Sequence, residues 1–224
     1  MDFRKFSIKT KRISKDEKEI GISLNAYREG KIVSKTGLDV EVCNTIFFTD
    51  TCHSFQYNNI YSLEELKVLT SIPKYRVSPK IKDVSYMFGN CRSVESIDTS
   101  AFYGIQPKDM TGMFFFCQNL KYLDLTGIDF SQVTSYRVMF HSCTSLQRID
   151  GVFDLSNIKS NDDLENLNNM FKKCPSTLKV KLRNIPSNFY TAIKPKRTSD
   201  FGNVVAMPCS QRMGLKPEQI EIVE

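Results

Sequence analysis

The stretch that decides the fold is Val84-Ser85-Tyr86-Met87-Phe88-Gly89-Asn90-Cys91, because the chain repeats it. The second copy is Met110-Thr111-Gly112-Met113-Phe114-Phe115-Phe116-Cys117, and the third is Tyr136-Arg137-Val138-Met139-Phe140-His141-Ser142-Cys143. Their Met-Phe pairs begin at 87, 113 and 139, a spacing of 26 residues, and a weaker copy, Leu167-Asn168-Asn169-Met170-Phe171-Lys172-Lys173-Cys174, follows 31 residues later. A fixed period of this size indicates stacked units that each bury a face on the next. The pattern favours a binding surface or an assembly part over an enzyme.

Each unit has two halves. In the first half, Val84, Met87, Phe88 and Cys91 are separated by steps of three and four, which predicts one face of a helix. The second half is a short extended run, such as residues 120–125, in which alternate apolar side chains would point inward from a strand. Strands of successive units would then pair as a parallel sheet.

The side chains that recur in phase are the expected shared interior. We expect the repeat cysteines to be small buried thiols rather than disulfide partners, because all four occupy one slot of the unit. The predicted repeat core is Met87, Phe88, Cys91, Met113, Phe114, Cys117, Met139, Phe140, Cys143, Met170, Phe171 and Cys174.

The run Leu123-Asp124-Leu125-Thr126-Gly127-Ile128-Asp129-Phe130-Ser131-Gln132-Val133-Thr134-Ser135-Tyr136, with the Met-Phe-x-x-Cys segments, resembles the BspA-like leucine-rich repeats, specifically the type first described in mycoplasma lipoproteins. The run from Asp154 to Ile158 repeats part of it, and the resemblance covers roughly residues 81–183. It implies an α/β fold, a short leucine-rich-repeat-like solenoid. Such repeats occur in bacterial surface proteins and adhesins, in protist surface proteins, and in phage or prophage proteins.

Three regions are expected. Residues 1–58 form a β-rich N-terminal cap or attachment region, residues 59–184 the solenoid, and residues 185–224 a C-terminal extension. Strands predicted within 3–10, 20–28, 31–35 and 38–48 suggest a small antiparallel sheet, and residues 62–69 a short helix that begins with a capping box. Residues 204–207 and 220–223 could each add a strand, and both flanks could cap the stack.

Charge is unevenly distributed along the chain. The net charge is +6, divided as +5 over residues 1–35, −5 over residues 36–171 and +6 over residues 172–224. Basic ends on an acidic body suggest self-association, or docking on an acidic partner, although solvated ends are an equal alternative.

Three aspartates lie seven residues after the repeat cysteines. In a parallel stack Asp98, Asp124 and Asp150 would align about 4.8 Å apart, and Lys181 in the fourth slot would pair with Asp150. One interpretation is a binding strip on the sheet face; the other is that each aspartate bonds to local backbone. The predicted strip comprises Ser96, Asp98, Tyr122, Asp124, Arg148, Asp150 and Lys181.

Catalysis has little support in the sequence. The two histidines are His53 and His141, and we expect His141 in an exposed loop. Nucleophilic catalysis would need a Cys–His pair such as Cys209 with His53. The chain has no Cys-x-x-Cys, phosphate loop or dinucleotide fingerprint, so we expect no catalytic residues, no metal site and no cofactor. Nucleic acid is a weak alternative partner, because the body is acidic.

The sequence therefore predicts a non-catalytic protein–protein interaction module whose partners are other protein subunits. A phage or prophage tail or virion component is the first expectation, a BspA-like surface adhesin the second, and a cysteine-dependent enzyme the third. The chain has no run of 18 apolar residues, and residues 1–9 do not read as a signal peptide. The expected location is thus a virion or the cytoplasm, with the cell surface as the alternative.

Overall fold

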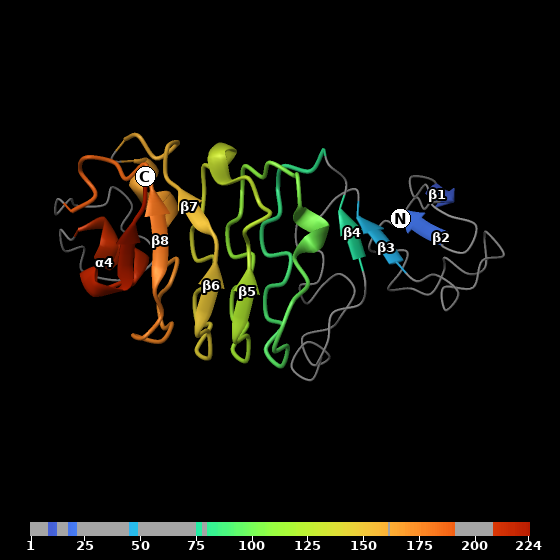
Figure 1. Ribbon diagram of the computed structural model, residues 1–224, viewed down its shortest axis with the longest axis horizontal. Helices are drawn as coiled ribbons and strands as arrows, with labels where there is room; N and C mark the ends of the chain where they lie inside the picture. The colour runs from blue at the N-terminus through green and yellow to red at the C-terminus, as the bar shows by residue number, and fades with distance from the viewer. Residues whose placement is uncertain are drawn as a thin grey trace, which may run out of the picture.

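The computed structural model describes residues 9–12, 18–21, 45–48, 75–77, 80–160, 162–190 and 208–224. It is a mixed α/β structure with small parallel sheets and few helices (Figure 1). The helical segments in these residues are α4 (Cys209–Met213) and 3₁₀ turns at Ser100–Phe102, Phe130–Gln132, Asp163–Leu167 and Pro217–Gln219. The predicted helix at 62–69 and strand at 204–207 lie outside the described residues.

The N-terminal sheet has the order β1 (Lys9–Arg12), β2 (Lys18–Gly21), β3 (Thr45–Phe48) and β4 (Tyr75–Val77). Only β1 and β2 are antiparallel; β2, β3 and β4 are parallel. The expected antiparallel pairing is thus found between β1 and β2, but it is wrong for β2 and β3, and the strand predicted at 31–35 lies outside the described residues. Five residues join β1 to β2, whereas connections of more than twenty residues precede β3 and β4, long enough for the crossover that parallel strands require.

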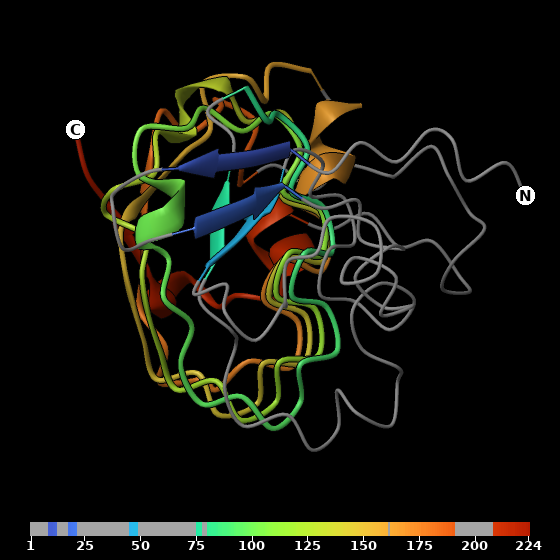
Figure 2. The ribbon, with the colours of Figure 1, turned by 90° about the vertical axis from the view of Figure 1, so that its right-hand side faces the viewer.

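Two further parallel sheets follow in chain order. β5 (Tyr122–Asp124) pairs with β6 (Arg148–Asp150), and β7 (Val152–Asp154) pairs with β8 (Val180–Arg183), which pairs with β9 (Ile220–Ile222). The predicted strand at 220–223 is thus formed within the chain. Viewed along the long axis, the repeated segments nest behind one another (Figure 2).

The Met-Phe halves are not helices, which corrects the expectation from their spacing. Within the first copy, Met87 N donates to Val84 O and Cys91 N to Phe88 O, so the chain forms consecutive turns. Tyr86 and Asn90 have φ of 51° and 65°, which ends any helical run. Steps of three and four also arise from successive turns, so the spacing alone could not separate the two structures.

The remaining backbone groups of these turns join one copy to the next. In the first copy the amides of residues 84, 86, 88 and 90 donate to the carbonyls of residues 109, 111, 113 and 115 at 2.7–2.9 Å. The second copy donates to the third in the same way, and the third to the fourth. Along each copy, one set of alternate amides closes turns within the copy and the other set links it to the next copy. This pairing leaves few buried backbone donors without a partner.

A column of aromatic rings fills the interior. Phe88 stacks on Phe114 with a centroid distance of 5.6 Å, Phe114 on Phe140 at 5.3 Å, and Phe140 on Phe171 at 5.2 Å, with interplanar angles of 8–11°. The repeat methionines and phenylalanines are buried, as are the cysteines, apart from Cys174, which is partly exposed. Equivalent residues of successive copies thus share one core.

α4 closes the C-terminal end of this stack. The amides of Asn169 and Phe171, which correspond to donors that link the earlier copies, donate to Arg212 O at 2.6 Å and Met213 O at 2.7 Å. The helix ends at Gly214, whose φ is 85°. The C-terminal segment therefore continues both the turns and, through β9, the sheet. No helix among the described residues combines the length and the apolar character needed to cross a membrane.

Candidate functional site

The predicted strip lies largely on one face of the β5–β6 sheet. Strand pairing places Tyr122 beside Arg148 and Asp124 beside Asp150, and an isolated bridge places Ser96 beside Tyr122. Leu123 and Ile149 point to the core between these exposed or half-exposed side chains, as strand alternation requires. The sheet therefore brings Tyr122, Arg148, Asp124 and Asp150 together on one face, and the bridge adds Ser96 beside Tyr122.

Tyr122, Arg148 and Asp150 form an ordered group on this face. The Arg148 guanidinium donates to both Asp150 carboxylate oxygens at 2.8 Å, and Tyr122 Oη donates to Asp150 Oδ2 at 2.9 Å. Arg148 also lies 5.6 Å from the centre of the Tyr122 ring. The Arg148 and Tyr122 hydrogen bonds lower the pKa of Asp150, and the bond to Asp150 raises the pKa of Tyr122. Asp150 is thus an anion and Tyr122 a neutral donor at neutral pH.

Asp98 and Asp124 bond locally instead. Asp98 accepts from Ser100 N at 2.9 Å, and Asp124 accepts from Thr126 N at 2.9 Å and Thr126 Oγ1 at 2.6 Å. The Thr126 hydrogen bonds lower the pKa of Asp124. The alternative interpretation, bonding to local backbone, therefore describes these two aspartates but not Asp150.

One sequence signal separates the aspartates. Six aspartates are followed two residues later by Ser or Thr and accept a hydrogen bond from its backbone amide, which is a short Asx turn. These are Asp83, Asp98, Asp109, Asp124, Asp129 and Asp154. Asp150 is followed by Gly151 and Val152, lacks this turn, and bonds to Arg148 and Tyr122.

The aspartate row ends where the sheet breaks. Gly151 has φ of 143°, and a Cβ there would lie 3.1 Å from Leu125 Cβ. Beyond it, the strand pairing changes from Asp124 opposite Asp150 to Val152 opposite Lys181. The prediction that Lys181 pairs with Asp150 is therefore wrong; Lys181 Nζ lies 3.9 Å from Glu221 Oε1. The longer fourth repeat shifts the register by three residues, from a difference of 26 to one of 29.

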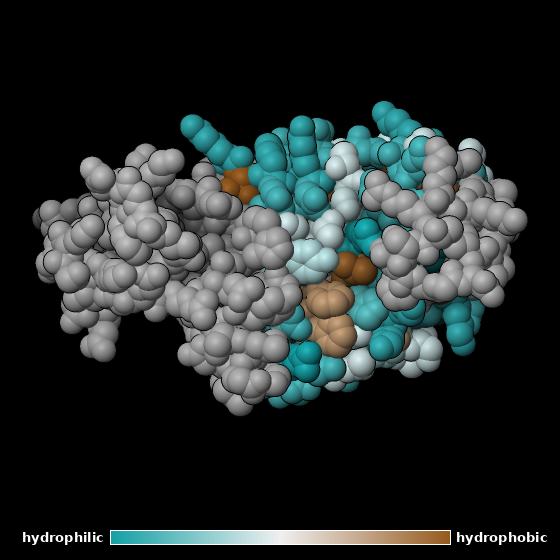
Figure 3. All heavy atoms as spheres, turned by 180° about the vertical axis from the view of Figure 1, so that it is seen from behind, coloured by the Kyte–Doolittle hydropathy of each residue, from teal (hydrophilic) through white to brown (hydrophobic). Residues whose placement is uncertain are grey.

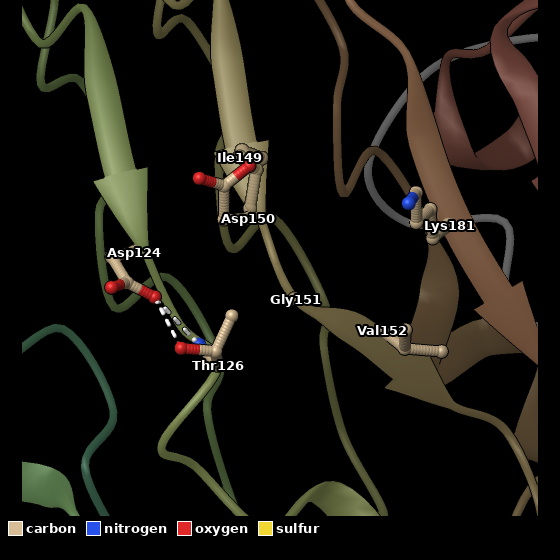
Figure 4. Close-up of a pocket in the computed structure, with 7 residues that line it drawn as sticks. All are labelled: Asp124, Thr126, Ile149, Asp150, Gly151, Val152 and Lys181. Carbon is tan, nitrogen blue, oxygen red and sulfur yellow. Dashed lines mark hydrogen bonds between the residues drawn. The ribbon is translucent and has the colours of Figure 1, made fainter.

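A cleft of about 300 Å³ opens at this break (Figure 4). The carboxylates of Asp124 and Asp150 lie on one side and Lys181 on the other, with Gly151 between the two sheets. The lining residues are Asp124, Thr126, Ile149, Asp150, Gly151, Val152 and Lys181. The sequence analysis missed Thr126, Ile149, Gly151 and Val152. The sequence signal for this place is that Asp150, unlike Asp124, has no Ser or Thr two residues later and is followed by Gly151.

The thiols of the repeat cysteines are hydrogen-bonded from one unit to the next and are protonated at neutral pH. The Sγ atoms of Cys117, Cys143 and Cys174 donate to the carbonyls of Phe88, Phe114 and Phe140, one unit earlier, at 3.1–3.2 Å. Burial raises the pKa of Cys117 and of Cys174 to about 12. All five cysteines in the described part of the chain are free thiols.

His141 is half-buried rather than in an exposed loop. Its ring centre lies 5.4 Å from that of Phe115 and 5.7 Å from that of Phe116, and Arg92 lies 5.2 Å from the Phe116 ring centre. Burial, followed by Lys173 and Lys172, lowers the pKa of His141, so it is neutral at neutral pH. His53, the suggested partner of Cys209 in a nucleophile pair, lies outside the described residues.

Large apolar side chains are rarely exposed on the described surface. The exposed ones are Tyr103, Tyr122, Tyr190 and Ile222. The coloured part of the face seen in Figure 3 is largely hydrophilic around a small hydrophobic area. Within the described ranges, no group of three or more His, Cys, Asp or Glu side chains is arranged to hold a metal ion.

These features define a mixed α/β protein of repeated units with an exposed polar strip. The chain belongs to the family described as "Mycoplasma protein of unknown function, DUF285", whose model matches residues 53–184. That family is related to BspA-like repeat proteins. No curated protein and no solved structure matches the chain.

Proposed function

We propose that the chain is a non-catalytic protein–protein interaction module, built as a short leucine-rich-repeat-like solenoid, within a larger assembly such as a phage or prophage tail or virion. The stacked phenylalanines and the hydrogen bonds between copies support the solenoid, because each copy contacts mainly its neighbours. Solenoids of this kind commonly bind partners along an extended face.

The observation that carries the proposal is the ordered group of Tyr122, Arg148 and Asp150. The Tyr122 residue is 42% exposed and the Arg148 side chain 70% exposed, yet both are held by Asp150. Tyr and Arg are the residue types enriched among side chains that dominate protein interfaces. Holding them in place before binding lowers the entropy lost on association.

The protonation of Cys209 disfavours a cysteine-dependent enzyme. Burial raises the pKa of Cys209 to about 12, so the reactive thiolate is scarce at neutral pH.

The relationship of the family to BspA-like repeat proteins favours a surface adhesin as the second candidate. Protease treatment of intact cells that make the protein separates the two candidates. Cleavage of the chain supports the adhesin, and protection in cells with incorporation into particles supports the assembly component.

The proposed surface is tested with a Tyr122→Ala/Arg148→Ala double variant and affinity capture from the native lysate or purified particle. We expect the partner bound by the wild type to be lost, with the melting temperature nearly unchanged because both side chains are exposed. Tyr190→Ala, at a tyrosine that is 51% exposed and outside the strip, is the matched control and should retain the partner. Retention by the double variant would contradict a role for this face.

A further inference from the structure

The stack has an edge strand at each end of its long axis. β1 is the outermost strand of the N-terminal sheet and β9 the outermost strand of the C-terminal sheet. Figure 1 shows β1 at one extreme of the molecule and β8, the partner of β9, near the other, with the C-terminus. Each of these two strands pairs on one side with a described strand, and none of the described strands pairs with its other side. Exposed strand edges are sites where a further chain can add.

The two edges carry opposite charge. β1 has the sequence Lys-Thr-Lys-Arg, three cations in four residues. The last eight residues, 217–224, contain Glu218, Glu221 and Glu224 and no Lys or Arg. The Glu221 side chain is 56% exposed and only loosely paired, with Lys181 Nζ 3.9 Å away. The acidic residues 217–224, which include the edge strand β9, are thus a local exception in a C-terminal segment that is basic overall, whereas the edge strand β1 is itself basic.

β9 is also exposed as an edge. Val223 N donates inward to Leu182 O at 2.9 Å. Since alternate residues of a strand direct their backbone groups to opposite sides, the Ile222 amide points to the open edge. The Ile222 residue is 61% exposed, the highest value among the large apolar residues of the described surface. An apolar side chain, an outward donor and flanking carboxylates thus lie together at this end.

We propose that a second copy of this chain docks here, so that the β9 edge of one molecule pairs with the β1 edge of the next, head to tail. Pairing of two β9 edges is disfavoured because it would oppose like charges, as would pairing of two β1 edges. A contact between different ends is heterologous, and it extends to filaments unless the rotation closes a ring. The inference rests on the proposed function as an assembly part, but it uses the ends rather than the Tyr122–Arg148 face.

The test uses two full-length variants, each blocked at one end. Ile222→Pro removes the outward amide while the inward Val223 bond is retained, and Ile222→Val is its control. K9E/K11E/R12E reverses the charge of the β1 edge. Far-UV circular dichroism and thermal unfolding verify folding; if Ile222→Pro is unfolded, Ile222→Lys replaces it as an edge blocker.

Sedimentation velocity over a concentration series is the measurement. We expect the wild type and Ile222→Val to form multimers that weaken with added salt, and each blocked variant to remain monomeric. An equimolar mixture of the two blocked variants should give a dimer and nothing larger, because each supplies one intact end. Tyr122→Ala should associate as the wild type does, which separates this inference from failure of the proposed binding face.

Three results would overturn the proposal. The first is a wild type that stays monomeric at every concentration. The second is a K9E/K11E/R12E variant that still self-associates, which would indicate pairing of identical β9 edges. The third is a mixture of blocked variants that fails to form the dimer.

Discussion

The repeat cysteine shows how one side chain serves this fold. Its thiol is small enough for the close-packed interior, and it donates to the phenylalanine carbonyl of the preceding unit, as Cys117 does to Phe88 O at 3.1 Å. Burial raises the pKa of all four repeat thiols, and for Cys117 to about 12. The folded protein thus holds these protons more tightly than the unfolded chain does.

This difference predicts a loss of stability at alkaline pH. Because the folded pKa is raised, the contribution is complete below the ordinary thiol pKa of about 8.5 and is lost as pH rises toward 12. Over that window each such thiol should lower the free energy of unfolding by about 1.4 kcal/mol per pH unit. Urea unfolding from pH 7.5 to 10.5 should therefore show a shallower decline in Cys117→Ala than in the wild type. Parallel declines would contradict the assignment.

α4 is the element that ends the stack. It has only five residues, yet it receives the Asn169 and Phe171 amides that would otherwise be unpaired at the last repeat. Its end fits closely, since a Cβ on Gly214 would lie 2.7 Å from both Cα and N of Lys172. The absence of a side chain at this position therefore permits the helix to dock.

Gly214→Ala should detach this end from the last repeat. The alanine faces both a left-handed backbone, at about 1 kcal/mol, and a backbone clash worth roughly 1–3 kcal/mol more. Gly104→Ala is the matched control, because φ is 79° there but nothing lies within 4 Å of the added Cβ. Urea denaturation should show the larger loss for Gly214→Ala, with faster amide exchange at Asn169 and Phe171. Equal losses would mean that the close approach does not matter.

At the scale of the whole molecule, stability comes from contacts between neighbouring copies. Phe114 is stacked on both sides, by Phe88 and by Phe140, whereas Phe115, the next residue, is only partly buried. A repeat array whose units contact mainly their neighbours loses stability wherever one interface is broken.

Phe114→Ala should therefore lower the free energy of unfolding by about 3–5 kcal/mol. Phe115→Ala, the adjacent control, should cost clearly less because its ring is only partly buried. Chemical denaturation followed by circular dichroism measures both. A similar cost for the two changes would argue against the aromatic column as the main source of stability.

Parts of this arrangement could be read before the structure. The 26-residue spacing and the recurring Met, Phe and Cys indicated which side chains share the interior, because a fixed period repeats the same contacts in every copy. The alternation around Leu123 likewise indicated a strand. The helix assigned to the Met-Phe half was wrong because turns with positive φ at Tyr86 and Asn90 reproduce the same spacing.

By itself, then, the sequence determined the repeat period, the interior side chains and the row of aspartates, since these follow from local spacing and side-chain polarity. The tertiary structure decided that Asp150 binds Arg148 and Tyr122, that Lys181 lies opposite Val152, and that α4 closes the stack. These depend on contacts between residues 26 or more apart, except for Asp150 with Arg148, and on the register shift at Gly151. The strand register at Lys181 and the docking of α4 depend on how distant side chains and backbone groups fit together in three dimensions. No local sequence pattern encodes that fit.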